Sequence, residues 1–93
     1  MRRQVDPATR RAIASIAWPL RQFGAGWAEA LECASNVIAT VVLADVPVDE
    51  ALAGAISHRR RHFSLRLSDD CMAVAVATRS YWRARALEER WAA

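Results

Sequence analysis

Hydrophobic residues recur every three or four positions along the first half of the chain, from residue 13 to residue 41. This spacing places the hydrophobic side chains in one stripe along one side of an α-helix. The stripe consists of Ile13, Ile16, Leu20, Phe23, Trp27, Ala30, Ala34, Val37 and Val41. It predicts an all-α fold, in which helices pack against helices.

Asp6 and Pro7 mark the start of the first helix, because aspartate is a favoured N-cap and proline suits the first helical position. We expect this helix over residues 7–23, with a kink or a division at Pro19. Two glycines in residues 24–26 form the strongest break signal in the chain. The hydrophobic period is nevertheless kept across them, so one long bent helix is the alternative to two helices.

The second helix is expected over residues 26–44, with Trp27 in the core. Its last turns are hydrophobic on all sides, because Val41, Val42 and Leu43 follow one another. A helix that is hydrophobic all round is typically buried. The sequence therefore predicts that this helix is central.

A third helix is predicted by its charges. Asp49 and Glu50 suit a first turn and residues 59–61, all arginine, suit a last turn, where the helix dipole favours each sign. Residues 63–68 then alternate between hydrophobic and polar, which is typical of a strand. We predict an extended connector there, with a short strand that pairs with its copy in a dimer as the alternative.

The last helix begins near residues 68–70, which are suitable caps. Residues 72–77 are hydrophobic on all sides and are expected to be buried. Beyond Thr78 the helix becomes amphipathic. Its hydrophobic side carries Tyr81, Ala84, Leu87 and Trp91, and the arginines outside that side are Arg79, Arg83 and Arg90.

The length of 93 residues fits one domain, so we predict a compact bundle of three to four helices over residues 1–93, with residues 1–5 flexible. Hydrophobic residues make up 54% of the chain and four residues are tryptophan. A chain this small has little interior in which to bury so much hydrophobic surface. A second copy would cover part of it, so we expect a homodimer.

Cys33 and Cys71 lie far apart and show no CxxC spacing, which favours two reduced thiols. No signal peptide is recognisable, and the most hydrophobic segment, residues 33–44, is too short to span a bilayer. The sequence therefore favours a cytoplasmic protein and gives no reason to expect a membrane partner.

The basic residues are all arginine: 13 of them stand against 10 acidic residues, for a net charge of +3. Arginine without lysine, together with abundant alanine, is typical of a GC-rich bacterial genome. The excess is smaller than that of a dedicated nucleic-acid-binding domain. It favours a protein partner with an acidic surface, with nucleic acid as the alternative.

Arginine, tryptophan and tyrosine are enriched in binding hot spots. On this basis we assign to a partner-binding surface Arg59, Arg60, Arg61, Arg79, Tyr81, Trp82, Arg83 and Trp91. The pattern predicts a small regulatory or adaptor protein that binds another protein through a helical face, in the manner of an antiactivator, chaperone or inhibitor. The alternative is a nucleic-acid-binding regulator that uses residues 59–61.

Catalysis and metal binding find little support in the sequence. His58 and His62 have the spacing of two ligands on one helix face, but the three arginines between them repel a cation. Cys71 and His62 lack a third orienting group, which a nucleophilic site needs. We therefore predict no catalytic residue, no cofactor and no metal.

Overall fold

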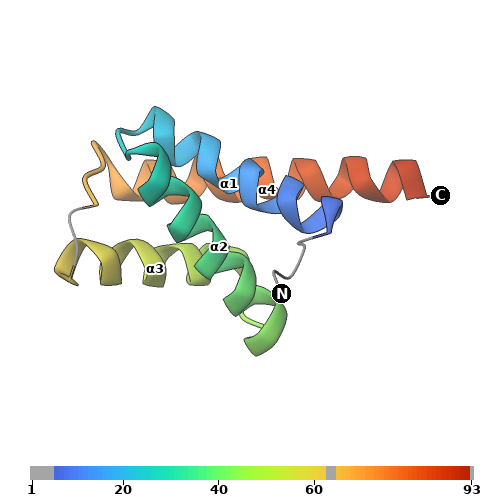
Figure 1. Cartoon of the computed structure of the whole chain (residues 1–93), viewed down its shortest axis with the longest axis horizontal. Helices are drawn as coiled ribbons and strands as arrows, with labels where there is room; N and C mark the ends of the chain where they lie inside the picture. Colours follow the sequence, from blue (N-terminus) through green and yellow to red (C-terminus); the bar gives the residue numbers. More distant parts are fainter. Residues whose placement is uncertain (1–5, 63–64, 93) are drawn as a thin grey trace, which may run out of the picture.

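The computed structural model describes residues 6–62 and 65–92, and of residues 91 and 92 only the backbone. It contains four helices and, within these residues, no strand: α1 (Pro7–Gln22), α2 (Trp27–Ala44), α3 (Val48–His62) and α4 (Asp70–Ala92) (Figure 1). The prediction of an all-α bundle is confirmed. The flexibility that we predict for residues 1–5 concerns a segment outside the described residues.

The four helices pack in a ring, in which α1 contacts α2 and α4, and α3 contacts the same two helices. Neighbouring helices run in opposite directions, and the C-terminal end of α4 projects past the other three (Figure 1). The helices α2 and α4 thus lie on opposite sides of the core. Each turns one side inward and leaves its other side without a neighbour.

The core follows the predicted stripe over most of its length. Ile16, Leu20, Ala30, Ala34 and Val37 are all fully buried. They pack against residues of the other helices and the α3–α4 connector, among them Leu52, Ile56, Leu65, Ala73, Ala77 and Tyr81. The periodicity therefore identified the inward sides of α1 and α2 correctly.

The first two helices are separate, which decides between the two predicted arrangements. The break contains Gly24, whose φ of 116° is accessible to glycine and strained for other residues. The backbone N–H groups of Gly24 and Ala25 donate to carbonyls of the last turn of α1, and the carbonyl of Phe23 accepts from Ser68. Pro19 does not divide α1, which runs unbroken to Gln22 with the proline ring buried.

Three expectations of burial are wrong, and one physical reason accounts for two of them, Leu43 and Met72. Trp27 is 44% exposed, Leu43 at the end of α2 is 84% exposed, and Met72 in the first turn of α4 is 54% exposed. A helix in a ring of four has only two neighbours, so a run that is hydrophobic on all sides still turns one side to solvent. The helix α2 is therefore not central.

The connector between α3 and α4 has neither helix nor strand at residues 65–67, in agreement with the prediction of a connector. Leu65 and Leu67 are buried, while Arg66 between them is exposed. The carboxylate of Asp69 caps α4 by accepting a hydrogen bond from the backbone N–H of Met72 at 3.0 Å. The alternation in this segment thus reflects side chains that point alternately toward the core and toward solvent; Phe63 and Ser64 lie outside the described residues.

One described helix, α2, is long and hydrophobic enough to cross a membrane if length and composition alone are considered. Only 28% of its span is buried within the protein. A core helix of a soluble protein passes the same test, so this property is weak support for membrane insertion.

Candidate functional site

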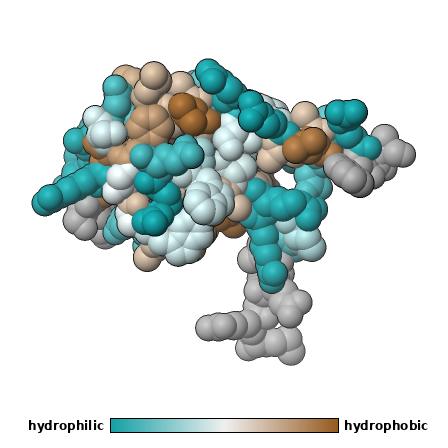
Figure 2. Space-filling model, turned by 90° about the horizontal axis from the view of Figure 1, so that it is seen from above, coloured by the Kyte–Doolittle hydropathy of each residue, from teal (hydrophilic) through white to brown (hydrophobic). Residues whose placement is uncertain are grey.

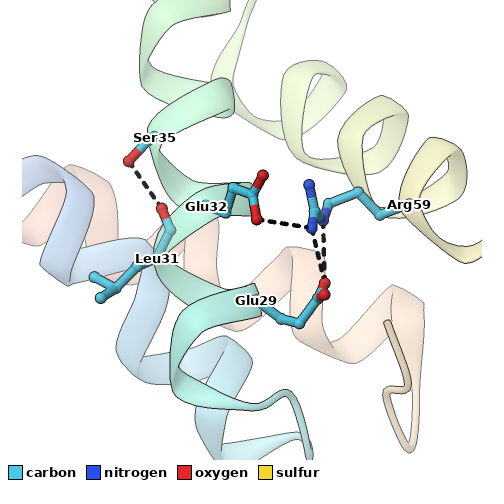
Figure 3. A network of polar contacts seen from close by, with 5 residues as sticks. All are labelled: Glu29, Leu31, Glu32, Ser35 and Arg59. Carbon is cyan, nitrogen blue, oxygen red and sulfur yellow. Dashed lines mark hydrogen bonds and ion pairs between the residues drawn. The ribbon is translucent and has the colours of Figure 1, made fainter. Parts of the chain in front are cut away.

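Arg59, which we expected on the partner-binding surface, lies in the interior between α2 and α3. Its Nη2 donates to an Oε2 atom of Glu29 at 2.9 Å and to one of Glu32 at 3.3 Å, and its Nε donates to Glu29 at 3.3 Å (Figure 3). The residue is only 5% exposed. Burial disfavours its charge, but the hydrogen bond and the charges of the two glutamates outweigh burial and raise the pKa of the guanidinium. Arg59 therefore joins two helices and is not available to a partner.

The sequence contains a signal for this position. Arg59 follows Leu52 and Ile56 at intervals of four and three, so it shares their buried side of α3. The basic run of residues 59–61 concealed this period. A second signal lies in α2, where Glu29 and Glu32 stand next to inward residues and can pair with a buried arginine.

Arg60 and Arg61, the other two arginines of the run, are exposed, and each contacts a neighbouring side chain. Arg60 forms an ion pair with Asp70 in the first turn of α4, and Nη2 of Arg61 lies 3.4 Å from Oγ of Ser57. Between α3 and α4 lies an open groove of about 510 Å³ with a mainly hydrophobic lining that includes Ile56 and Cys71. The predicted basic patch is therefore divided: Arg59 is buried, Arg60 is paired with Asp70, and Arg61 is exposed beside Ser57.

The outward side of α4 carries arginines without carboxylates. We call α4 stripe the exposed residues Met72, Ala75, Arg79, Trp82, Arg83, Ala86 and Arg90. Of the three acidic residues of α4, Asp70 pairs with Arg60 and Glu88 with Arg11, while Glu89 is exposed at the edge of the stripe. Within the described part of the chain no carboxylate pairs with the arginines of the α4 stripe. This stripe is thus a positive surface whose charge is not compensated.

Tyr81, a second residue that we expected on the partner-binding surface, is 6% exposed and belongs to the core. It lies one residue from Trp82, and the two rings meet edge to face with centroids 5.1 Å apart. Trp82 itself is 56% exposed. The buried ring of Tyr81 therefore packs against the ring of Trp82 from the core side and is not accessible to a partner. The side chain of Trp91 is outside the described residues.

The outward side of α2 differs in composition. We call α2 stripe the residues Ala28, Leu31, Ser35, Ala39 and Val42, of which Leu31 is half-buried and the others are exposed. The only charged residues of α2 are Glu29 and Glu32, and both side chains reach toward Arg59, on the other side of the helix from Ser35 (Figure 3). The α2 stripe is therefore uncharged along its whole length.

An aromatic cluster adjoins the start of α2 and was not recognised in the sequence. The rings of Trp18 and Trp27 lie 5.4 Å apart, and the guanidinium of Arg21 lies 5.8 Å from the ring centre of Trp27. Trp18 is 60% exposed. Hydrophobic surface is thus spread over the outside of the molecule, as the brown patches between hydrophilic side chains in Figure 2 also show for the face drawn there.

The groups with potential reactivity are dispersed. Burial raises the pKa of the Cys33 thiol to about 11, so this thiol is protonated at neutral pH. Cys71 is exposed beside the groove between α3 and α4. The rings of His58 and His62 lie 4.6 Å apart, but among the described residues no three potential ligands gather into a metal site.

Comparison of this chain with protein-family models, with curated proteins and with solved structures finds no match. A function for this chain therefore has to be inferred from the residues on its surfaces.

Proposed function

We propose that the protein is a small regulatory or adaptor protein that binds an acidic surface of another protein through the α4 stripe. The observation that carries this proposal is the set of arginines on that stripe, Arg79, Arg83 and Arg90, which form no ion pair with a carboxylate in the described structure. An uncompensated charge of one sign attracts a partner of the opposite sign and accelerates its association.

Trp82 supplies the second part of the proposed mechanism. An exposed indole that is held in place by a buried neighbour loses little conformational entropy on binding and offers a large hydrophobic contact. Trp82 meets this description, because Tyr81 packs against its ring from the core side. Arginine would thus direct the encounter, and tryptophan would supply much of the affinity.

A nucleic acid is the second candidate, because the same arginines could contact phosphates. Arg79 and Arg90 are eleven residues apart, which corresponds to about 16 Å along the helix axis. Two observations favour a protein: the net charge is only +3, and the described part of the α4 stripe offers one aromatic ring, whereas single-stranded nucleic acids are bound by several.

The experiment is a capture from lysate with a photo-crosslinking amino acid in place of Ala86, which is exposed on the α4 stripe one turn after Trp82, followed by identification of the crosslinked species. We expect a protein that nuclease treatment does not remove. Its capture should be lost in Trp82→Ala and in Arg79→Glu/Arg83→Glu. The matched control is Arg10→Glu/Arg66→Glu, which makes the same change of charge at exposed positions off α4 and should retain the partner.

Capture of nucleic acid instead, with binding that falls steeply as salt rises, would support the second candidate. Equal capture by both double variants would contradict both candidates, since neither could then depend on the α4 stripe.

A further inference from the structure

We infer that the α2 stripe is the contact surface for a second copy of this chain, which packs against it antiparallel about a twofold axis at Ser35. This inference concerns a different surface from the one in the proposed function and does not depend on it.

The first argument is the spacing of the α2 stripe, which is symmetric about Ser35. Ala28 and Val42 lie seven residues before and after Ser35, and Leu31 and Ala39 lie four before and four after. An antiparallel pair centred on Ser35 therefore sets Ala28 at the level of Val42 of the other copy, and Leu31 at the level of Ala39. Each of these two levels combines one small and one larger side chain, and the size of the side chains at the contact sets the distance between two packed helices.

The second argument is charge. In a twofold dimer each surface meets its own copy, so a charged stripe would repel itself. The α4 stripe, with its arginines, cannot pair with itself in this way. The α2 stripe can, because Arg59 holds the two carboxylates of α2 on the side that faces α3.

The third argument is that the hydroxyl groups on the exposed side of α2 are already satisfied. The hydroxyl of Ser35 donates to the carbonyl of Leu31 at 2.8 Å (Figure 3), and the hydroxyl of Thr40 donates to that of Asn36 at 2.9 Å. A buried hydroxyl without a partner is costly. Since these hydroxyls have partners within the helix, a second copy can cover them with little penalty.

The extent of the surface sets the expected affinity. The α2 stripe spans fourteen residue steps, about 21 Å, and the cluster of Trp18 and Trp27 adjoins its start. One helix pair of this length buries less than the roughly 800 Å² per partner of a standard interface. We therefore expect a dimer that dissociates on dilution, and one that high salt does not disrupt, because the contact is uncharged.

The experiment is the mass in solution by light scattering, measured on the full chain over a range of micromolar concentrations at low and at high salt. We expect a monomer–dimer equilibrium in the wild type. Ser35→Lys should shift it to monomer, because two positive charges would meet at the axis. The matched control Ala86→Lys adds the same charge at an exposed position of α4 and should leave the dimer intact.

A second measurement does not depend on the stability of the Ser35→Lys variant. In a chain with Cys33→Ala and Cys71→Ser, a cysteine at position 35 should form an intermolecular disulfide under mild oxidation, whereas one at position 86 should not. A wild type that is monomeric at all concentrations would overturn the inference, as would a dimer that Ser35→Lys does not affect. Binding of such a monomer to vesicles of phosphatidylcholine and phosphatidylglycerol would assign the α2 stripe to a lipid surface instead.

Discussion

The outward sides of α2 and α4 are both without a neighbouring helix in the described structure, yet they differ in one decisive property. The α4 stripe carries arginines and no carboxylate, whereas the α2 stripe carries no charge. The difference is seen at the contact with α3, where Glu29 and the largely exposed Glu32 pair with Arg59 on the side of α2 away from Ser35. The molecule thus has an uncharged surface, which we propose for self-association, and a positive surface, which we propose for an acidic partner.

Among the variants that test this comparison, the largest loss of stability is expected for Arg59→Ala, which removes the residue that pairs with both glutamates of α2. Loss of one partner of a buried ion pair typically costs about 3 to 5 kcal/mol. Glu29 is partly exposed and can regain water, so we expect a loss of about 2 to 3 kcal/mol. Urea unfolding followed by circular dichroism measures the free energy of unfolding.

The control for Arg59→Ala is Arg61→Ala, which removes an exposed arginine from the same run and should change stability by less than about 0.5 kcal/mol. Equal stability of the two variants would show that the Arg59 cluster does not hold α2 and α3 together.

The second prediction compares the two helices through the pH dependence of stability, because α2 carries Cys33 and α4 carries Cys71. Burial raises the pKa of Cys33 in α2 from 9.0 to about 11, so the folded state holds this proton more tightly than the unfolded state. The resulting stability is complete below about pH 9 and is lost as the pH rises toward 11. Two pKa units correspond to about 2 to 3 kcal/mol.

Cys33→Ala should remove this alkaline loss, while Cys71→Ala in α4 should retain it, since Cys71 is exposed. The measurement is the urea midpoint of each variant at pH 8.5 and above, in steps. An alkaline slope that is identical in Cys33→Ala and in the wild type would place its origin elsewhere.

The smallest effect on stability is expected for the exposed tryptophans. Trp82→Ala and Trp18→Ala remove rings that are more than half exposed, and each should lower stability by about 1 kcal/mol or less. Ile16→Ala, in the core of the same bundle, should cost about 2 to 5 kcal/mol. If Trp82→Ala were as damaging as Ile16→Ala, the ring of Trp82 would have a structural role, and our assignment of it to the partner-binding surface would be wrong.

The sequence predicted the fold through periodicity, which is a local property of a helix. Ile16, Leu20 and Ala34 are buried because their spacing places them on one side, and this needs no knowledge of the neighbours. The exposure of Leu43 could not be predicted in this way. It depends on how many helices surround α2, and this number cannot be inferred from a hydrophobic run in the sequence.

The candidate surfaces were predicted only in part, for a similar reason. Arg79, Trp82 and Arg83 are exposed as their positions in the amphipathic pattern suggest. Arg59 belongs to the same basic run as Arg60, and only its contacts with α2 distinguish it. The charge of a residue can thus be read from the sequence, whereas the partner that compensates it comes from another part of the chain.

The most direct test of the two-surface account measures both activities on the same pair of variants. Mass by light scattering and retention of the captured partner are determined for Ser35→Lys and for Arg79→Glu/Arg83→Glu. The account predicts that Ser35→Lys is monomeric and retains the partner, while the double variant remains dimeric and loses it. Loss of both properties in one variant, with the fold intact by circular dichroism, would contradict the separation of the two surfaces.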